Sequence, residues 1–286
     1  MRHSLATDVN EWRFRLVDTG ALDPALNMGL DEAVLESVAR GDAPPTIRFY
    51  GWTRPTVSLG YFQRARKEID VDAIASADYR LVRRMTGGRA VLHDRELTYS
   101  VVVDAEHPLA KASVVESYRL LSAGLRDGFQ GLGVNAQLVS LADTGEKAKF
   151  ASAGSAACFD SPSWYELVVA GKKIAGSAQV RAHGGLLQHG ALLLELDAED
   201  LFSLLLFRSE AERARLRSDF EERAVSVRDL TNRQVTYQEA SQAFARGFAT
   251  GLPAVLDTGQ LTEQEWARGQ DLAREKYSCD EWTFRR

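Results

Sequence analysis

The residues best suited to chemistry gather in one stretch, from Cys158 to Leu194. Cys158 stands fifteen residues before Lys173. A cysteine thiolate accepts acyl groups, and a lysine ammonium beside it favours the thiolate and can hydrogen-bond a developing oxyanion. Residue types alone leave open the alternative that Cys158 is a buried structural cysteine and Lys173 a surface lysine.

The pattern around Lys173 predicts a β-hairpin. WYELVV alternates and is rich in aromatic and β-branched residues, an Ala-Gly pair marks a turn, and the chain returns through KKIAGSAQVR and then LLQHGALLLEL. Lys173 is therefore expected just after a tight turn, where a strand resumes and then breaks at Gly176. The small residues Gly176, Ser177 and Ala178 leave room for a substrate to approach the backbone.

A second informative stretch runs from Tyr79 to Val103 and contains the pair Gly87-Gly88 between two β-like runs. No helix follows the glycines, which argues against a dinucleotide fingerprint or a P-loop. Two interpretations remain. The loop, flanked by Arg83, Arg84 and Arg89, cradles an acyl carbonyl or an anion with its backbone amides, or it is a hairpin turn with scattered surface charge.

Two histidines, His93 and His189, are candidates for general bases or for hydrogen-bonded core residues. His93 follows the glycine loop, and His189 lies in an apolar strand expected at the floor of a pocket. The cysteine, histidine and carboxylate residues show no metal-ligand spacing, so we expect no metal. Cys279 is interpreted as structural or incidental.

The rest of the chain predicts a mixed α and β fold. Strand-like runs include WRFRLVD, TIRFYGW and TVSLGYF, and a helix is expected from Pro24 to a stop at Gly41, with Asp31 and Glu32 on its solvated face. Ser113 to Gly131 also has helical periodicity. Helices dominate after Leu196, which favours an α+β architecture with a helical C-terminal part packed on a mixed sheet.

Composition places the chain among ordinary globular proteins. It has 286 residues, 45% hydrophobic and 26% charged, with a formal net charge of -5. This charge argues against nonspecific binding of nucleic acid or membrane surfaces by the whole molecule. No apolar run is long enough for a membrane span, the first ten residues lack the core of a signal peptide, and the chain has two cysteines. We therefore expect a cytoplasmic protein with reduced thiols.

Four motifs in fixed order, RRMTGGRAVLHD, ELTYSVVV, GKKIAGSAQ and QHGALLL, resemble the family of lipoate-protein ligases, octanoyltransferases and biotin ligases. The resemblance implies the class II aminoacyl-tRNA synthetase and biotin synthetase-like α/β fold, with a catalytic domain over residues 12–250 and a C-terminal helical extension over 251–286. It also implies that Lys173 is the lysine that contacts the acyl carbonyl. The implied acyl-tunnel loop comprises Arg83, Arg84, Gly87, Gly88, Ala90, Val91 and His93.

Two departures from the ligases favour the octanoyltransferase branch, in which a cysteine carries the acyl group. Arg89 stands where ligases usually have a third glycine, and Cys158-Phe159-Asp160 replaces their asparagine-aspartate pair. The resemblance thus implies transfer of octanoate from acyl carrier protein, through Cys158, to the glycine cleavage H protein or another lipoyl domain, without a cofactor. Basic residues, namely Arg83, Arg84, Arg89, Lys147 and Lys149, are expected to receive these acidic partners.

Three alternatives remain open. An ATP-dependent lipoate or octanoate ligase would leave Cys158 a bystander. An amidotransferase between lipoyl-domain proteins would use the same cysteine and lysine. A non-catalytic acyl-binding protein would have no need for both residues.

Overall fold

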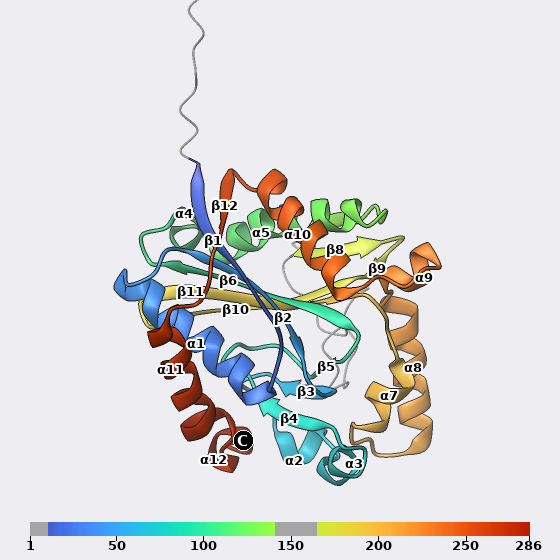
Figure 1. Ribbon diagram of the computed structural model, residues 1–286. Coiled ribbons are helices and arrows are strands. Elements are labelled where there is room, and N and C mark those ends of the chain that lie inside the picture. The colour runs from blue at the N-terminus through green and yellow to red at the C-terminus, as the bar shows by residue number, and fades with distance from the viewer. Residues whose placement is uncertain (1–10, 141–164) are drawn as a thin grey trace, which may run out of the picture.

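A six-stranded mixed sheet lies at the centre of the protein (Figure 1). The computed structural model describes residues 11–140 and 165–286, so Cys158, Lys147 and Lys149 lie outside the described residues. In spatial order the strands are β10 (Ala175–Ala182), β11 (Gly185–Leu193), β6 (Glu96–Asp104), β2 (Thr46–Trp52), β1 (Trp12–Leu22) and β12 (Ala254–Thr258). Three neighbours, β2, β1 and β12, run parallel, and the other pairings are antiparallel.

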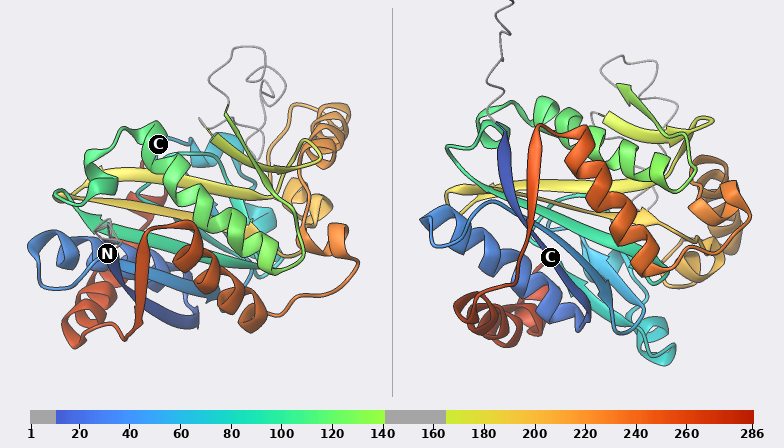
Figure 2. Two further views of the ribbon diagram at one scale, coloured as in Figure 1. Left: turned by 90° about the horizontal axis from the view of Figure 1, so that it is seen from above. Right: turned by 45° about the horizontal axis from the view of Figure 1, so that its top comes forward.

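Helices cover both faces of this sheet (Figures 1 and 2). On one face lie α5 (Val114–Gly131) and α10 (Tyr237–Gly251), whose apolar residues join the sheet in the largest core cluster. On the other face lies α1 (Pro24–Arg40), with α11 (Glu263–Leu272) packed outside it. Because both faces are covered, β6 is buried along nearly its whole length, including the polar residues Glu96, Thr98 and Ser100.

The expected solvated face of α1 is wrong. The helix begins at Pro24, capped by Asp23, and ends at Gly41 in the left-handed conformation. However, Asp31 and Glu32 are both buried. Asp31 faces the sheet, where it binds Arg48 of β2 and His189 of β11. Glu32 is covered by the π-helical turn η2 (Ala273–Tyr277) after α11, whose Tyr277 binds it at 2.6 Å. Periodicity within α1 cannot reveal a cover that comes from the other end of the chain.

Two small sheets complete the β-structure. The first contains β4 (Arg80–Arg83), β3 (Thr56–Leu59) and β5 (Val91–His93) in that order, so β3 separates β4 from β5. The glycine loop after β4 therefore crosses β3, and the hairpin interpretation of Gly87-Gly88 is wrong. The second contains β7 (Gln137–Ser140), β8 (Tyr165–Val169) and β9 (Lys172–Lys173).

The expected hairpin before Lys173 is present. Ala170 and Gly171 both have positive φ angles, of 48° and 80°, as a two-residue turn between antiparallel strands requires. The strand breaks at Ile174, between β9 and β10, and not at Gly176 as expected.

The remaining helices are short or peripheral: α2 (Ala65–Glu68), α3 (Val71–Ser76), α4 (Pro108–Lys111), α7 (Ala198–Ser203), α8 (Glu210–Arg223), α9 (Val227–Thr231) and α12 (Asp280–Thr283). The C-terminal part, expected to be helical, also contributes β12, which pairs with β1 at the sheet edge. None of the helices in the described ranges has the length and apolar character needed to cross a bilayer.

Candidate active site

A pocket of about 350 Å³ lies where α1, the central sheet and the small sheet of β3, β4 and β5 meet. We call it the acyl pocket. Seven of the residues singled out in the sequence line it, namely Arg84, Val91, His93, Gly176, Ser177, Ala178 and His189. Its lining combines apolar side chains with a few polar groups, as the lining of ligand pockets usually does.

Lys173 is not a surface lysine: its exposed fraction is 4%. Its Nζ atom lies 3.0 Å from Oε1 and 2.9 Å from Oε2 of Glu166. The two residues meet because Val168 is paired with Lys173 across the hairpin and Glu166 lies two positions away on the same face. The hairpin thus places the buried ammonium of Lys173 just before Gly176, Ser177 and Ala178, which line the acyl pocket.

His189 belongs to a buried polar network around Asp31. Its Nδ1 donates to Asp31 at 2.8 Å, and its Nε2 accepts from the Thr86 hydroxyl at 2.7 Å. Asp31 also binds Arg48 at 3.0 Å and Tyr50 at 2.9 Å. Burial lowers the pKa of His189 by more than the bond and charge of Asp31 raise it. His189 is therefore a neutral imidazole in the pocket wall, held in one tautomer.

Burial lowers the pKa of His189 but raises the pKa of Asp31, because it disfavours the charged form of each group. The hydrogen bond from His189 and the charge of Arg48 outweigh this effect, so the pKa of Asp31 lies below its ordinary value. Asp31 is thus the anion that orients His189.

His93 lies between two further groups. Its Nε2 is 2.7 Å from the Ser58 hydroxyl, and its Nδ1 is 2.5 Å from Oε1 of Glu96. The ring stacks on Trp52 with centroids 4.2 Å apart. Ser58 also accepts from Arg84 at 3.0 Å, so serine, histidine and glutamate form one ordered chain beside the acyl pocket.

Arg84 and Arg83 have different positions. The Arg84 guanidinium donates to the carbonyls of Gly87 and Arg89, both at 2.8 Å, and so shapes the glycine loop from inside. Gly88 has a φ of 91°, and a Cβ there would lie 2.7 Å from Arg84 Nη2. Only glycine permits this close packing.

The expectation that Arg83 belongs to the tunnel is wrong. Its exposed fraction is 0%, and it donates to main-chain carbonyls, including those of Gly60 at 2.8 Å and Thr283 at 2.7 Å. Through these hydrogen bonds, Arg83 links the loop after β3 to the C-terminal segment. Neither it nor the buried Arg84 presents a free charge to a partner. Ala90 is also outside the acyl pocket and lines a second pocket on the other side of β5.

Several pocket residues gave no signal in the sequence. Met28, Tyr50, Trp52, Ser58 and Thr98 also line the acyl pocket, each from an ordinary helix or strand. Glu166 was missed as well, although a carboxylate in a strand that pairs with the lysine strand is a usable indication.

Among the described residues, one group comes close enough to hold a metal, Glu32, Glu36 and His183. Lys276 binds Glu32 at 2.6 Å and Arg268 binds Glu36 at 2.8 Å. Because the carboxylates already have cationic partners, we assign no metal there.

The site thus combines a pocket at the junction of the two sheets with a buried lysine, Lys173, three positions before the lining residue Gly176. The family model for the lipoyl protein ligase A/B catalytic domain matches residues 23–249. The chain belongs to this family.

Relatives and solved structures agree. An octanoyltransferase LipM from Brevibacillus brevis is 50% identical, covering 97% of this chain and 100% of the relative. One from Bacillus subtilis is 47% identical over 96% and 98%. A bipartite lipoate protein ligase from Thermoplasma acidophilum has a TM-score of 0.78 at 27% identity, with 96% of each chain covered. Lipoate-protein ligase A with bound ATP has a TM-score of 0.74 at 28% identity, covering 96% of this chain and 98% of that one.

Proposed function

We infer that this protein is an octanoyltransferase that moves an octanoyl group from acyl carrier protein, through a thioester on Cys158, to a lysine of a lipoyl domain. The observation that carries the inference is the 50% identity, over 97% of the chain, to a protein known as an octanoyltransferase. The acyl pocket supports it, because apolar side chains such as Met28, Trp52 and Val91 line it together with a few polar groups.

The chemistry divides into two steps. The Cys158 thiolate attacks the carrier thioester, so a new C–S bond forms and the carrier thiol leaves. The acceptor amine then attacks the enzyme thioester, an amide forms, and Cys158 is released. Lys173 hydrogen-bonds the oxyanion in both steps, and Glu166 holds its ammonium at 2.9 Å. His189 and the chain of Ser58, His93 and Glu96 fix the pocket walls around the acyl group.

The acceptor is the glycine cleavage H protein or another lipoyl-domain protein, in the cytoplasm. The ligase-like structures, one of them with bound ATP, make ATP-dependent activation of free octanoate the second candidate. The two chemistries differ in their need for ATP and in the role of Cys158, and both differences are measurable.

The test is intact-protein mass spectrometry after mixing the enzyme with octanoyl-acyl carrier protein in the absence of ATP. We expect an octanoyl adduct on the wild type and on Cys279→Ala, but none on Cys158→Ala. Cys279 is the matched control because it is the other cysteine of the chain. The adduct should be discharged by a lipoyl domain.

Other outcomes would identify the alternatives. Modification of the lipoyl domain only with octanoate and ATP would make the protein a ligase. An adduct formed only from an octanoylated lipoyl domain would make it an amidotransferase. Acyl binding without transfer under all of these conditions would leave a non-catalytic binding protein.

A further inference from the structure

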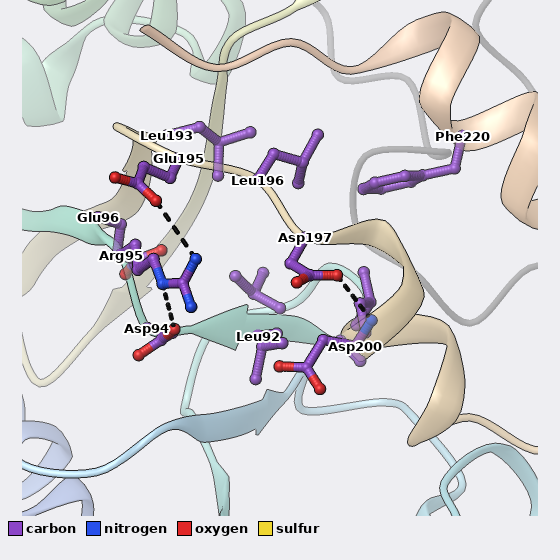
Figure 3. Close-up of a pocket in the computed structure, with 13 residues that line it drawn as sticks. Leu92, Asp94, Arg95, Glu96, Leu193, Glu195, Leu196, Asp197, Asp200 and Phe220 are labelled. Atoms are coloured by element: carbon purple, nitrogen blue, oxygen red, sulfur yellow. Dashed lines mark hydrogen bonds and ion pairs between the residues drawn. The ribbon is translucent and has the colours of Figure 1, made fainter. Parts of the chain in front are cut away.

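A second pocket, of about 520 Å³, lies on the other side of β5 from the acyl pocket (Figure 3). The strand separates the two because its side chains alternate: His93 faces the acyl pocket, Leu92 faces the second pocket, and Val91 touches both. Apart from Glu96 and Val91, its lining residues have no role in the mechanism proposed above. We call it the acidic pocket.

The acidic pocket combines apolar walls with crowded carboxylates. Leucine side chains and Phe220 line its inner part, and a single cation, Arg95, contributes to the lining. Figure 3 shows Arg95 between Asp94 and Glu195. The carboxylates that line the pocket are Asp94, Glu96, Glu195, Asp197 and Asp200.

The cationic groups at the pocket are too few for these anions. Arg95 lies 3.3 Å from both Asp94 and Glu195, and Glu195 also binds Arg228 at 2.8 Å, so two guanidinium groups serve the five carboxylates. Asp200 accepts a hydrogen bond from the neutral Tyr79 hydroxyl at 2.5 Å. Burial and then the neighbouring carboxylates raise the pKa of Asp94, although Arg95 opposes the shift. Burial and the neighbouring carboxylates thus disfavour the ionised form of Asp94 until a cation joins it.

Glu96 provides an independent indication of a ligand. Its side chain is 1% exposed, and its Oε1 receives both available hydrogen bonds, from His93 Nδ1 and from the Thr98 hydroxyl, each at 2.5 Å. Its Oε2 is buried and has no hydrogen-bond partner within residues 11–140 and 165–286. A buried carboxylate oxygen without a donor is costly, and a ligand N–H group would satisfy it.

We propose that the acidic pocket is the subsite that receives the lysine side chain of the acceptor as an alkylammonium. The proposal rests on the octanoyltransferase function. It assigns the place where the second substrate, the acceptor lysine, enters the enzyme. A lysine side chain matches the pocket because its four-carbon stem is apolar and its tip is a compact cation. Glu96, His93 and Ser58 form a continuous hydrogen-bonded chain from this pocket to the acyl pocket. A pocket carboxylate takes the ammonium proton before the neutral amine attacks the thioester.

Other ligands fit less well. The pocket carboxylates do not converge closely enough to form a metal site among the described residues. A polyphosphate would meet five carboxylates against the two guanidinium groups of Arg95 and Arg228, so electrostatic repulsion disfavours it.

Direct binding tests the proposal without catalysis. The probe is n-pentylammonium, titrated into the full-length protein by calorimetry, with 1-pentanol as the neutral comparison. The variant is Asp94→Asn with Asp200→Asn, which keeps side-chain size and an acceptor for Tyr79. The matched control is Asp257→Asn, an exposed aspartate that pairs with Arg13 at 3.1 Å at the far edge of the sheet.

We expect the wild type and Asp257→Asn to bind the ammonium at least fivefold more tightly than the double variant, and more tightly than they bind the alcohol. Equal binding by wild type and double variant, or equal affinity for ammonium and alcohol, would overturn the proposal.

A second readout separates this subsite from the proposed function. The double variant should form the acyl-enzyme from octanoyl-acyl carrier protein at the wild-type rate, but discharge it to a lipoyl domain with a KM raised at least fivefold. A parallel loss of both steps would show a merely structural role. Absence of any acyl-enzyme in the wild type would contradict the transferase function, while the calorimetric result on the pocket would still stand.

Discussion

The buried pair of Lys173 and Glu166 allows the role of a single residue in catalysis to be separated from its role in stability. Lys173→Met should lower acyl transfer by roughly 10²–10³-fold, the usual cost of losing an oxyanion donor. It should also destabilise the fold by about 3–5 kcal/mol, because the buried Glu166 carboxylate would lose its ion pair with Lys173. Rates of acyl-enzyme formation and urea unfolding measure the two effects.

Two further variants show whether Lys173→Met loses transfer because a catalytic group is missing or because the fold is destabilised. Replacing Glu166 with leucine in the Lys173→Met background removes both charges, so stability should return while transfer stays low. Lys172→Met is the neighbouring control, since the Lys172 Nζ binds only a main-chain carbonyl, that of Glu221 at 2.9 Å. Recovery of transfer in the double variant would show that Lys173 acts only as a structural counter-ion.

The sequence predicted individual site residues better than their partners. Lys173, His93 and His189 stand in recognisable motifs. Glu166 and Asp31 do not, because each meets its partner through strand pairing or helix packing that the linear order does not contain. Asp31 was assigned to solvent for this reason, and the same limitation concealed the burial of Arg83.

Among the larger elements, the crossing of α5 and α10 depends on glycine. A Cβ at Gly247 would collide with the backbone of Gly128 and with the carbonyl oxygen of Gly124, so the two helices approach at backbone contact. Gly247→Ala should therefore destabilise the protein by about 1–3 kcal/mol through overpacking. Gln242→Ala, on the exposed side of α10, should change the unfolding free energy by less than about 0.5 kcal/mol. Chemical denaturation measures the unfolding free energies of both variants. If Gly247→Ala were as stable as Gln242→Ala, the close approach of α5 and α10 would not depend on glycine.

The cap of α4 gives a pH prediction. Burial lowers the pKa of His107 to about 4, and its neutral Nδ1 accepts from the Leu109 N–H at 3.2 Å. The unfolded state, with an ordinary pKa of about 6.5, binds the proton first. The contribution of His107 is therefore complete above about pH 6.5 and is lost as the pH falls toward 4.

The measurement compares thermal unfolding from pH 7 to pH 4 for the wild type and His107→Asn. Asparagine also caps helices but does not titrate in this range. The wild type should lose about 1–2 kcal/mol more than the variant over this interval, a figure reduced for the partial exposure of the ring. Parallel pH profiles would show that His107 does not control acid stability.

The order of strands and helices was largely predictable, because alternation and caps are local. The strand β12 was not, since PAVLDTG becomes a strand only by pairing with the edge of β1. The order of β4, β3 and β5 also escaped prediction, because adjacency in sequence suggested a hairpin where the chain crosses a strand instead.

Across the whole molecule, charge is unevenly distributed despite the net value of -5. Phe62, 67% exposed, packs near the glycine loop. Five exposed cations lie in the same segments of the chain, namely Arg64, Arg66, Lys67, Arg285 and Arg286. None of the five has an ion-pair partner among the residues that the structure describes. Burial and then the charges of Arg285 and Arg286 lower the pKa of Arg83, which confirms that positive charge is concentrated here.

The basic surface predicts how the carrier-bound donor is recognised. Arg285 and Arg286 stack over Tyr61 at 4.4 and 5.8 Å, and Tyr61 is tied to the glycine loop through Thr86 at 2.8 Å. An acidic carrier protein docked here would place its thioester arm near the acyl pocket, and electrostatic attraction would speed the encounter. Arg285→Glu with Arg286→Glu should therefore lower kcat/KM for octanoyl-acyl carrier protein by about tenfold at low salt, and by less at high salt, where the attraction is screened.

A donor without a carrier protein separates docking from chemistry. With octanoyl-pantetheine, which has no acidic protein attached, the same double variant should react at the wild-type rate. Arg13→Glu with Arg126→Glu, two exposed arginines on β1 and α5, serves as the control and should leave both donors unaffected, because neither belongs to the segments 61–68 and 282–286 that form the basic surface. Steady-state rates with the two donors at 20 and 300 mM salt provide the comparison. An equal loss with pantetheine would place the effect in the pocket itself, and no loss with the carrier protein would mean that the donor binds elsewhere.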